Sequence, residues 1–162
     1  MFTPTNTFLS AHFSLSDALK SNTADADHIN NDPSVSTVTV MTIAASHMEV
    51  VRTELENTPI TVNSWYRCPE LNAAVGSKPT SQHIKGEAVD FTCAHFGTPV
   101  EVCKKLIDSR DRIQYDQLIL EHTWVHISFA ITSGEAPRGQ VLSLLSNGSY
   151  SSGLTDKEGN KL

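Results

Sequence analysis

The sequence predicts an α+β fold with a small antiparallel sheet and helices packed on one side. Three observations support this prediction. One long segment has the spacing of an amphipathic helix, several short segments have the pattern of strands, and the two kinds of element alternate without a regular parallel arrangement or an internal repeat. With 162 residues, the chain is also close to the usual size of one domain.

The first half of the chain is expected to form a surface wrap, one long helix and one strand. Residues 8–33 mix apolar residues with Ser, Asn and Asp, and residues 22–32 have no sustained apolar period, which is typical of a surface wrap with short helical turns. Residues 60–67 alternate after Pro59, so a strand ending in Arg67 is expected. Between them, residues 34–56 repeat apolar side chains every three or four positions, as a helix face does: Val38, Met41, Ala45, Met48, Val51 and Leu55.

The second half is expected to supply most of the sheet. Pro69 suits the first turn of a short helix over residues 69–75, and Gly76 is placed to end it. After a loop at residues 76–86, we expect strands at residues 88–93, 117–121, 124–130 and 140–145, with a helix at residues 99–109. One domain should cover residues 1–150, and the Ser- and Gly-rich residues 151–162 should form a flexible tail.

Composition and charge exclude several classes of function. The net charge of −6 comes without a Lys/Arg cluster, so nucleic acid is not an expected partner. No apolar run approaches the roughly 20 residues that a membrane span requires. The first residues lack a signal-peptide pattern, so we expect synthesis in the cytoplasm. The three cysteines Cys68, Cys93 and Cys103 should be buried free thiols, and a monomer is the expected state.

The segment with the clearest chemistry is S-Q-H-I-K-G-E-A-V-D, residues 81–90. Imidazole and carboxylate groups bind zinc, and a catalytic zinc site takes three such ligands with a fourth position for water. His83 and Asp90 are therefore candidate ligands. His126 is the obvious third donor, because a strand would hold it rigidly and Trp124 could shield the site. Taken singly, these residues could be a loop histidine, a buried capping acid and a core histidine; their joint spacing favours a metal site.

These motifs resemble the zinc D-alanyl-D-alanine carboxypeptidases and L-alanyl-D-glutamate endopeptidases that act on peptidoglycan, the phage-type branch above all. The pattern S-x-H-x-x-G-x-A-x-D is matched at every defined position by residues 81–90, and W-x-H by Trp124 and His126. The likeness extends over roughly residues 8–150. It implies a hedgehog-like, DD-peptidase-like fold, one zinc ion held by His83, Asp90 and His126, and peptidoglycan stem peptides as the substrate.

The resemblance also implies roles for residues that contact the substrate. Arg67 would bind a carboxylate or a peptide oxygen, since a guanidinium can hold a carboxylate through two hydrogen bonds. A surface pair with Glu70 is its simpler alternative. Ser81 would donate a hydrogen bond to the substrate near the metal, or would only cap its turn. Trp124 is placed with these substrate-binding residues.

The general base is expected to be Glu121. Many members of the family have glutamate three residues before the last histidine, where this chain has threonine. A continuous strand would put Glu121 and His126 on opposite faces. A two-residue turn at residues 122–123 would instead pair Glu121 with Trp124 and Ile119 with His126, on one face. His-Thr is unusual turn chemistry, so the catalytic assignment of Glu121 depends on this turn.

Other polar and aromatic side chains receive simpler interpretations. Glu87 is expected to be solvated, and Trp65 and Tyr66 to lie in the core or in a cleft wall. His122, in the proposed turn, would come close to the metal edge as a possible donor to the transition state.

Together, these features predict a zinc metallopeptidase that hydrolyses stem peptides of peptidoglycan as a carboxypeptidase or an endopeptidase. The phage-type resemblance suggests an endolysin that acts on the host cell wall after its release from the cytoplasm. A non-catalytic, zinc-containing wall-binding module of the same fold is the alternative.

Overall fold

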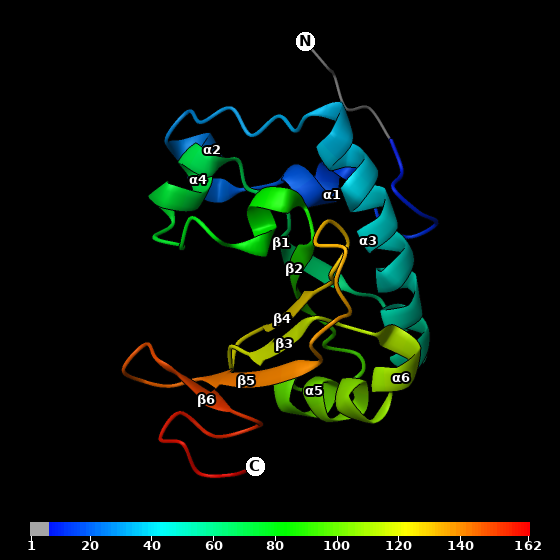
Figure 1. Cartoon of the computed structure of the whole chain (residues 1–162), viewed down its shortest axis with the longest axis vertical. Coiled ribbons are helices and arrows are strands. Elements are labelled where there is room, and N and C mark those ends of the chain that lie inside the picture. The colour runs from blue at the N-terminus through cyan, green and yellow to red at the C-terminus, as the bar shows by residue number, and fades with distance from the viewer. Residues whose placement is uncertain (1–6) are drawn as a thin grey trace.

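The computed structural model describes residues 7–162, which form one six-stranded sheet and a set of helices (Figure 1). The strands are β1 (Thr61–Ser64), β2 (Ala88–Thr92), β3 (Gln117–Leu120), β4 (Val125–Ser128), β5 (Gln140–Leu144) and β6 (Tyr150–Ser152). The helices are α1 (Leu15–Leu19), α2 (Asn22–Ala26), α3 (Val35–Glu54), α4 (Pro69–Ala74), the 3₁₀ helix η1 (Gln82–Lys85), α5 (Pro99–Asp108) and α6 (Arg110–Ile113). None of these helices is long and apolar enough to cross a membrane.

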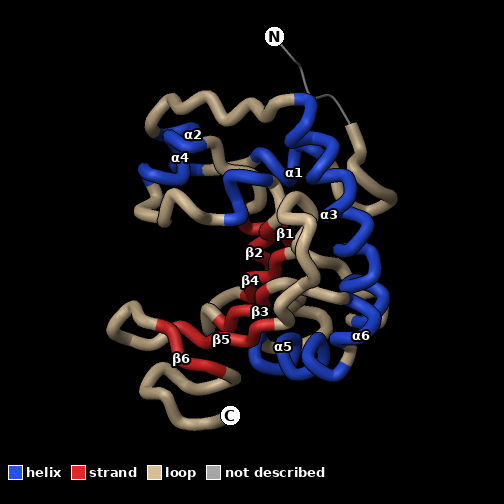
Figure 2. The backbone as a smooth tube through the Cα atoms, viewed as in Figure 1, coloured by secondary structure: helices blue, strands red, loops and turns tan. Residues whose placement is uncertain are grey.

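The sheet has the strand order β1-β2-β4-β3-β5-β6. Its neighbouring strands are antiparallel, as expected, except for β3 and β5, which run parallel. The parallel pair arises because the chain leaves β4 and returns through residues 129–139, named here the crossover loop, before β5 begins beside β3. In Figure 2 the strands form one continuous band, and in Figure 1 the crossover loop, coloured gold to orange, rises from this band.

Helices α3, α5 and α6 lie together on one side of the sheet (Figure 1), which confirms the expected α+β arrangement. Helix α3 begins at Ser34, whose side chain accepts a hydrogen bond from the backbone of Thr37. Five of the six residues predicted for the apolar face of this helix, Met41, Ala45, Met48, Val51 and Leu55, are inaccessible to solvent, and the sixth, Val38, is partly buried. They pack with the core-facing side chains of the central strands, including Phe91, Leu118, Leu120, Val125 and Ile127.

The first strand is shorter than the sequence predicts. β1 ends at Ser64, and Arg67 lies beyond it. After the strand, the backbone N–H of Tyr66 donates to Ala18, and that of Arg67 donates to His83. The chain therefore leaves the sheet because its hydrogen bonds go to α1 and η1 instead of β2.

The C-terminal residues have regular structure, whereas a flexible tail was expected. Strand β6 pairs with β5 in antiparallel fashion, and Thr155 forms an isolated bridge with Lys161. Buried Ser143 fastens the segment, because its hydroxyl accepts a hydrogen bond from the Thr155 N–H at 3.0 Å and donates to the carbonyl of Gly153 at 2.9 Å. Short polar side chains, which suggested flexibility, here supply the hydrogen bonds of a folded hairpin. The expected buried free thiols are confirmed at Cys68, Cys93 and Cys103.

Gly86 should be intolerant of substitution. It lies at the end of η1 with a φ of +78°, and a Cβ there would come within 2.7 Å of the Met41 side chain in the core. We expect Gly86→Ala to lower the free energy of unfolding by about 2–4 kcal/mol, because left-handed strain adds to overpacking. Urea unfolding followed by circular dichroism measures this.

Gly153→Ala is the matched control for this prediction. Gly153 has a φ of +81°, but a Cβ there would meet nothing within 4 Å. This variant should have only the backbone strain, so its free energy of unfolding should fall clearly less than that of Gly86→Ala. Equal losses for the two variants would contradict the role given to the contact with Met41.

Candidate active site

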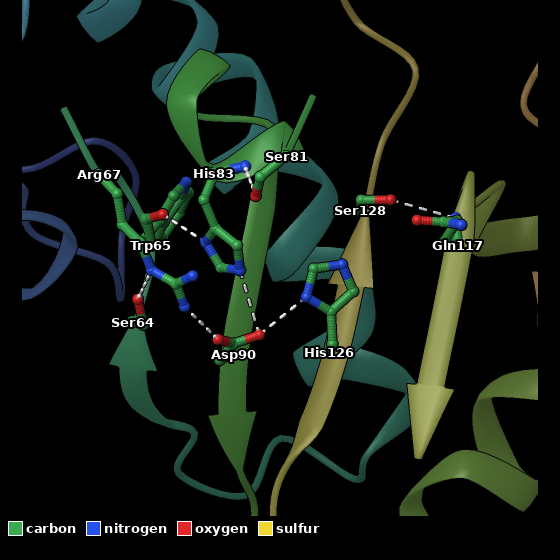
Figure 3. A network of polar contacts seen from close by, with 9 residues as sticks. All are labelled: Ser64, Trp65, Arg67, Ser81, His83, Asp90, Gln117, His126 and Ser128. Carbon is green, nitrogen blue, oxygen red and sulfur yellow. Dashed lines mark hydrogen bonds and ion pairs between the residues drawn. The ribbon is translucent and has the colours of Figure 1, made fainter. Parts of the chain in front are cut away.

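Three side chains that could hold a metal ion meet at the open face of the sheet. Asp90 of β2 pairs in register with His126 of β4, and His83 extends from η1 toward both of them (Figure 3). The His126 Nδ1 lies 2.8 Å from Asp90 Oδ1, and the His83 Nε2 lies 3.3 Å from the same oxygen. The three ligand atoms all lie within 4.8 Å of one another. The structure thus brings together the three residues that the motif predicted as ligands.

His83 is held rigidly by the segment around it. Ser81 caps η1, and its hydroxyl accepts a hydrogen bond from the His83 backbone N–H at 3.3 Å. The ring Nδ1 lies 2.6 Å from the backbone carbonyl of Trp65, an acceptor that leaves Nε2 free to bind a metal. Trp65 is itself buried, and its indole N–H donates to Gly86 at 2.8 Å. The capping role of Ser81 is therefore present, and Trp65 belongs to the core.

Asp90 lies at the centre of the charge network. Arg67 donates to Asp90 Oδ2 at 2.8 Å through Nη2 and to the Ser64 hydroxyl at 2.9 Å through Nε (Figure 3). Burial alone would raise the pKa of Asp90, but His83 and His126 outweigh it and hold that pKa well below its ordinary value. The carboxylate is therefore charged. Arg67 pairs with this carboxylate and not with Glu70, the simpler partner considered from the sequence.

The donor set fits zinc. It supplies two imidazole nitrogens and one carboxylate oxygen, which zinc accepts at about 2.0–2.2 Å, so a tetrahedral ion would hold these atoms roughly 3.4 Å apart. The His83–Asp90 separation of 3.3 Å matches that value, and the His126–Asp90 separation of 2.8 Å is shorter, at a hydrogen-bond distance. Burial lowers the pKa of His83, against the opposing charge of Asp90, which favours the neutral imidazole that binds metal. Three protein ligands also leave a position for water, as a catalytic site requires.

Glu121 lies on the same side of the sheet as the metal ligands. The Glu121 N–H donates to Trp124 at 3.1 Å, and Ile119 pairs with His126, so residues 122–123 form the expected two-residue turn. Glu121, Trp124 and His126 consequently line one cleft together with Arg67, and its volume is about 1200 Å³. The predicted pairing is confirmed. The catalytic role of Glu121 stays a prediction.

The surroundings of Glu121 alter its acidity. Burial raises the pKa of Glu121, and the nearby Asp90 charge adds to this effect. His126 and a hydrogen bond with the Tyr150 hydroxyl act in the opposite direction without cancelling it. A carboxylate with a raised pKa is a better proton acceptor, which is what a general base needs near neutral pH.

Two expectations about neighbouring residues are wrong. Glu87 is 2% exposed, whereas a solvated side chain was expected. It is buried because the crossover loop folds over it, and the backbone N–H of Thr132 donates to its carboxylate at 2.6 Å. His122 does not point to the metal edge, since its Nε2 lies 2.8 Å from the backbone carbonyl of Leu144 in β5. That contact holds the turn against the neighbouring strand.

Two cleft residues had no signal in the sequence. Tyr150 of β6 reaches Glu121, and Arg138 of the crossover loop pairs with buried Asp116 at the cleft wall. Both come from the part of the chain after the last recognisable motif. Only the folding of the C-terminal hairpin and the crossover loop onto the sheet reveals that they face the cleft.

An open set of two imidazoles and one carboxylate, with a glutamate beside it in a peptide-sized cleft, defines a metal-dependent hydrolase. Residues 11–128 match the family model described as Peptidase M15, and the chain belongs to this family. It is therefore a zinc metallopeptidase for substrates of the peptidoglycan type. A search among curated proteins found no match.

Replacing Tyr150 by Phe should shift the pH dependence of activity. The Tyr150 hydroxyl near Glu121 lowers the pKa of Glu121, so its removal raises that pKa further and leaves less of the basic form at low pH. The acidic limb of kcat/KM should move to higher pH, with activity on that limb falling about two- to tenfold, as for one lost hydrogen bond. A pH profile of peptide hydrolysis measures this. An unchanged acidic limb would contradict the coupling.

Proposed function

We propose that His83, Asp90 and His126 hold the catalytic zinc of this peptidase and that Glu121 is its general base, in the hydrolysis of peptidoglycan stem peptides. The observation that carries the proposal is that all four side chains line one cleft at the open face of the sheet. The two-residue turn supports it further, because it gives Glu121 and His126 the same orientation.

The proposed reaction needs one proton acceptor and a fixed peptide. When bound, zinc polarises the scissile carbonyl and lowers the pKa of a water molecule. Glu121 accepts a proton from the attacking water and returns it to the leaving amine. Arg67 positions Asp90 and offers its remaining N–H groups to a substrate oxygen. Ser81 and Trp124 line the same cleft and orient the peptide.

The biological setting is a further part of the proposal. The phage-type motif suggests an endolysin, which is made in the host cytoplasm, acts on the cell wall after release and works as a monomer. Two bonds fit the chemistry: the terminal D-Ala-D-Ala bond and the internal L-Ala-D-Glu bond. The cleft, about 1200 Å³ in volume, has room for a peptide cut at either bond.

Mass spectrometry of digested peptidoglycan tests this proposal. The zinc-loaded protein should release fragments whose masses identify the bond: loss of one alanine for a carboxypeptidase, or a new D-glutamyl N-terminus for an endopeptidase. Treatment with a chelator should stop the release, and added zinc should restore it. A zinc-loaded protein that releases nothing would favour the wall-binding module instead.

A further inference from the structure

Arg138 is held at the cleft by an unusually complete set of hydrogen bonds. Its Nη2 donates to Asp116 Oδ2 at 2.6 Å, its Nε donates to Asp116 Oδ1 at 3.0 Å, and its backbone N–H donates to the same Oδ1 at 3.0 Å. Asp116 is buried at the start of β3, whereas the Arg138 side chain is 55% exposed. A fixed carboxylate thus supports a guanidinium whose outer edge faces solvent.

This edge can still bind a ligand. Asp116 occupies the Nε and one part of Nη2, so the Nη1 group and the second hydrogen of Nη2 remain free to form a bidentate contact. The hydrogen bonds from Arg138 keep the pKa of Asp116 below its ordinary value, so the supporting carboxylate stays charged. Because Asp116 already fixes the guanidinium, little side-chain entropy is lost when a carboxylate binds to it.

Arg67, the arginine expected to bind the substrate, is less available. Its side chain is 15% exposed, and its two bonds go to Asp90 and Ser64 beside the metal ligands. Two other cations line the cleft, Lys78 and Lys85, but lysines are point charges on flexible stems and lack a planar fork. Among the cleft residues, Arg138 combines a fixed position with an open edge.

The position of Arg138 suits a group away from the scissile bond. Ile119 of β3 pairs with His126, which in turn pairs with Asp90, so these three residues form one row across the sheet. Gln117 lies two residues before Ile119 on β3, and Asp116, which binds Arg138, directly precedes Gln117. Two strand residues correspond to about 7 Å. Glu121 lies two residues from Ile119 in the other direction. Asp116, which holds the guanidinium, and Glu121, the proposed base, therefore lie just beyond opposite ends of β3, on either side of the row that contains Asp90 and His126.

We propose that Arg138 is a carboxylate-binding subsite that recognises a free carboxylate of the substrate peptide. The inference rests on the proposed function, because a stem peptide carries such groups at its D-glutamyl residue and at its C-terminus. Arg138 lies outside the residues that match the family model, so this subsite belongs to the C-terminal part of this chain. The bond between Asp116 and Arg138 makes Asp116 a positioning residue.

Peptide binding tests the proposal without turnover. Isothermal titration of zinc-loaded Glu121→Gln protein would use L-Ala-D-Glu-L-Lys-D-Ala-D-Ala, the same peptide with the D-glutamyl carboxylate amidated, and the same peptide with the C-terminus amidated. Arg138→Gln, added to this background, should raise the Kd of the unmodified peptide by about ten- to hundredfold, the range for hydrogen bonds to a charged group. Arg138→Lys should recover part of the loss.

The amidated peptides identify the carboxylate. One of them should bind the parent protein as weakly as the unmodified peptide binds Arg138→Gln, and should lose nothing more in that variant. Arg112→Gln is the matched control, since Arg112 pairs with Glu54 away from the cleft, and it should leave every Kd unchanged.

Three results would overturn the inference: no binding of the unmodified peptide, no effect of Arg138→Gln, or an equal loss for all three peptides. An equal loss of affinity would show that the Asp116–Arg138 ion pair only stabilises the crossover loop. Thermal unfolding of the variants measures that stabilising role separately. A protein that binds the peptide through Arg138 but releases nothing from peptidoglycan contradicts the proposed hydrolysis alone. An active enzyme that is indifferent to Arg138 contradicts only the subsite.

Discussion

Replacing His126 by Ala is expected to abolish stoichiometric zinc binding and to lower peptidase activity by at least about a thousandfold. Two ligands, His83 and Asp90, would remain, which is one fewer than a catalytic zinc site uses. Without the ion, neither the scissile carbonyl nor the attacking water is activated. The zinc-to-protein ratio after dialysis and the rate of peptide release measure the two effects.

The fold should survive this change. His126 lies on the open face of β4, whereas its neighbours Val125 and Ile127 are fully buried in the core. Thermal unfolding in the presence of a chelator should therefore be similar for the variant and the unmodified protein. His95→Ala is the matched control, because this exposed histidine follows β2 outside the cleft, and it should keep both zinc and activity. Full zinc content in the His126 variant would contradict the ligand assignment.

Glu121→Gln should have the second largest effect, a fall in kcat of about 10²- to 10⁴-fold, the usual contribution of a general base. Glutamine keeps the size of the side chain and its hydrogen bonding but cannot accept the proton. Since Glu121 is not one of the three ligands, the zinc-to-protein ratio should stay at one ion per chain. Steady-state kinetics and metal analysis on the same sample distinguish this variant from the ligand variant.

Glu135→Gln provides the comparison for Glu121. Glu135 is also a glutamate of the cleft lining, but it lies in the exposed crossover loop and not on the hairpin that carries His126. Its replacement should change kcat by less than about threefold, as for a surface substitution away from special features. Similar losses in the two variants would mean that cleft charge, not proton transfer, explains the effect of Glu121.

The local patterns in the sequence predicted the parts of the fold that depend on local rules. The apolar spacing of α3 marked its buried face, and the proline and glycine around α4 marked its ends. The meeting of His83 and Asp90 could be predicted because the motif places them at a fixed separation on either side of a glycine turn. The pairing of Glu121 with Trp124 followed from the two-residue turn, in which His122 adopts a φ of +65° that is uncommon outside glycine.

Other features depend on contacts between distant segments and could not be predicted. Arg67 pairs with Asp90 because η1 and β2 fold beside the end of β1, a placement that no local spacing encodes. Glu87 was expected to be a surface acid because its partner is a backbone N–H of the crossover loop, and a sequence pattern does not indicate such a contact. The C-terminal segment looked flexible for the same reason, since the Ser143 contacts that fasten it are non-local.

The β3–β4 hairpin carries both the proposed base and one of the proposed ligands, and only His122 and Thr123 separate the paired residues Glu121 and Trp124. Adding or deleting one residue there would shift the strands by one position and turn Glu121 or His126 toward the core. Divergent descendants of this protein can therefore exchange the residues of the turn but not its length. An alignment of such descendants should be free of gaps between Glu121 and Trp124, while the crossover loop accumulates insertions.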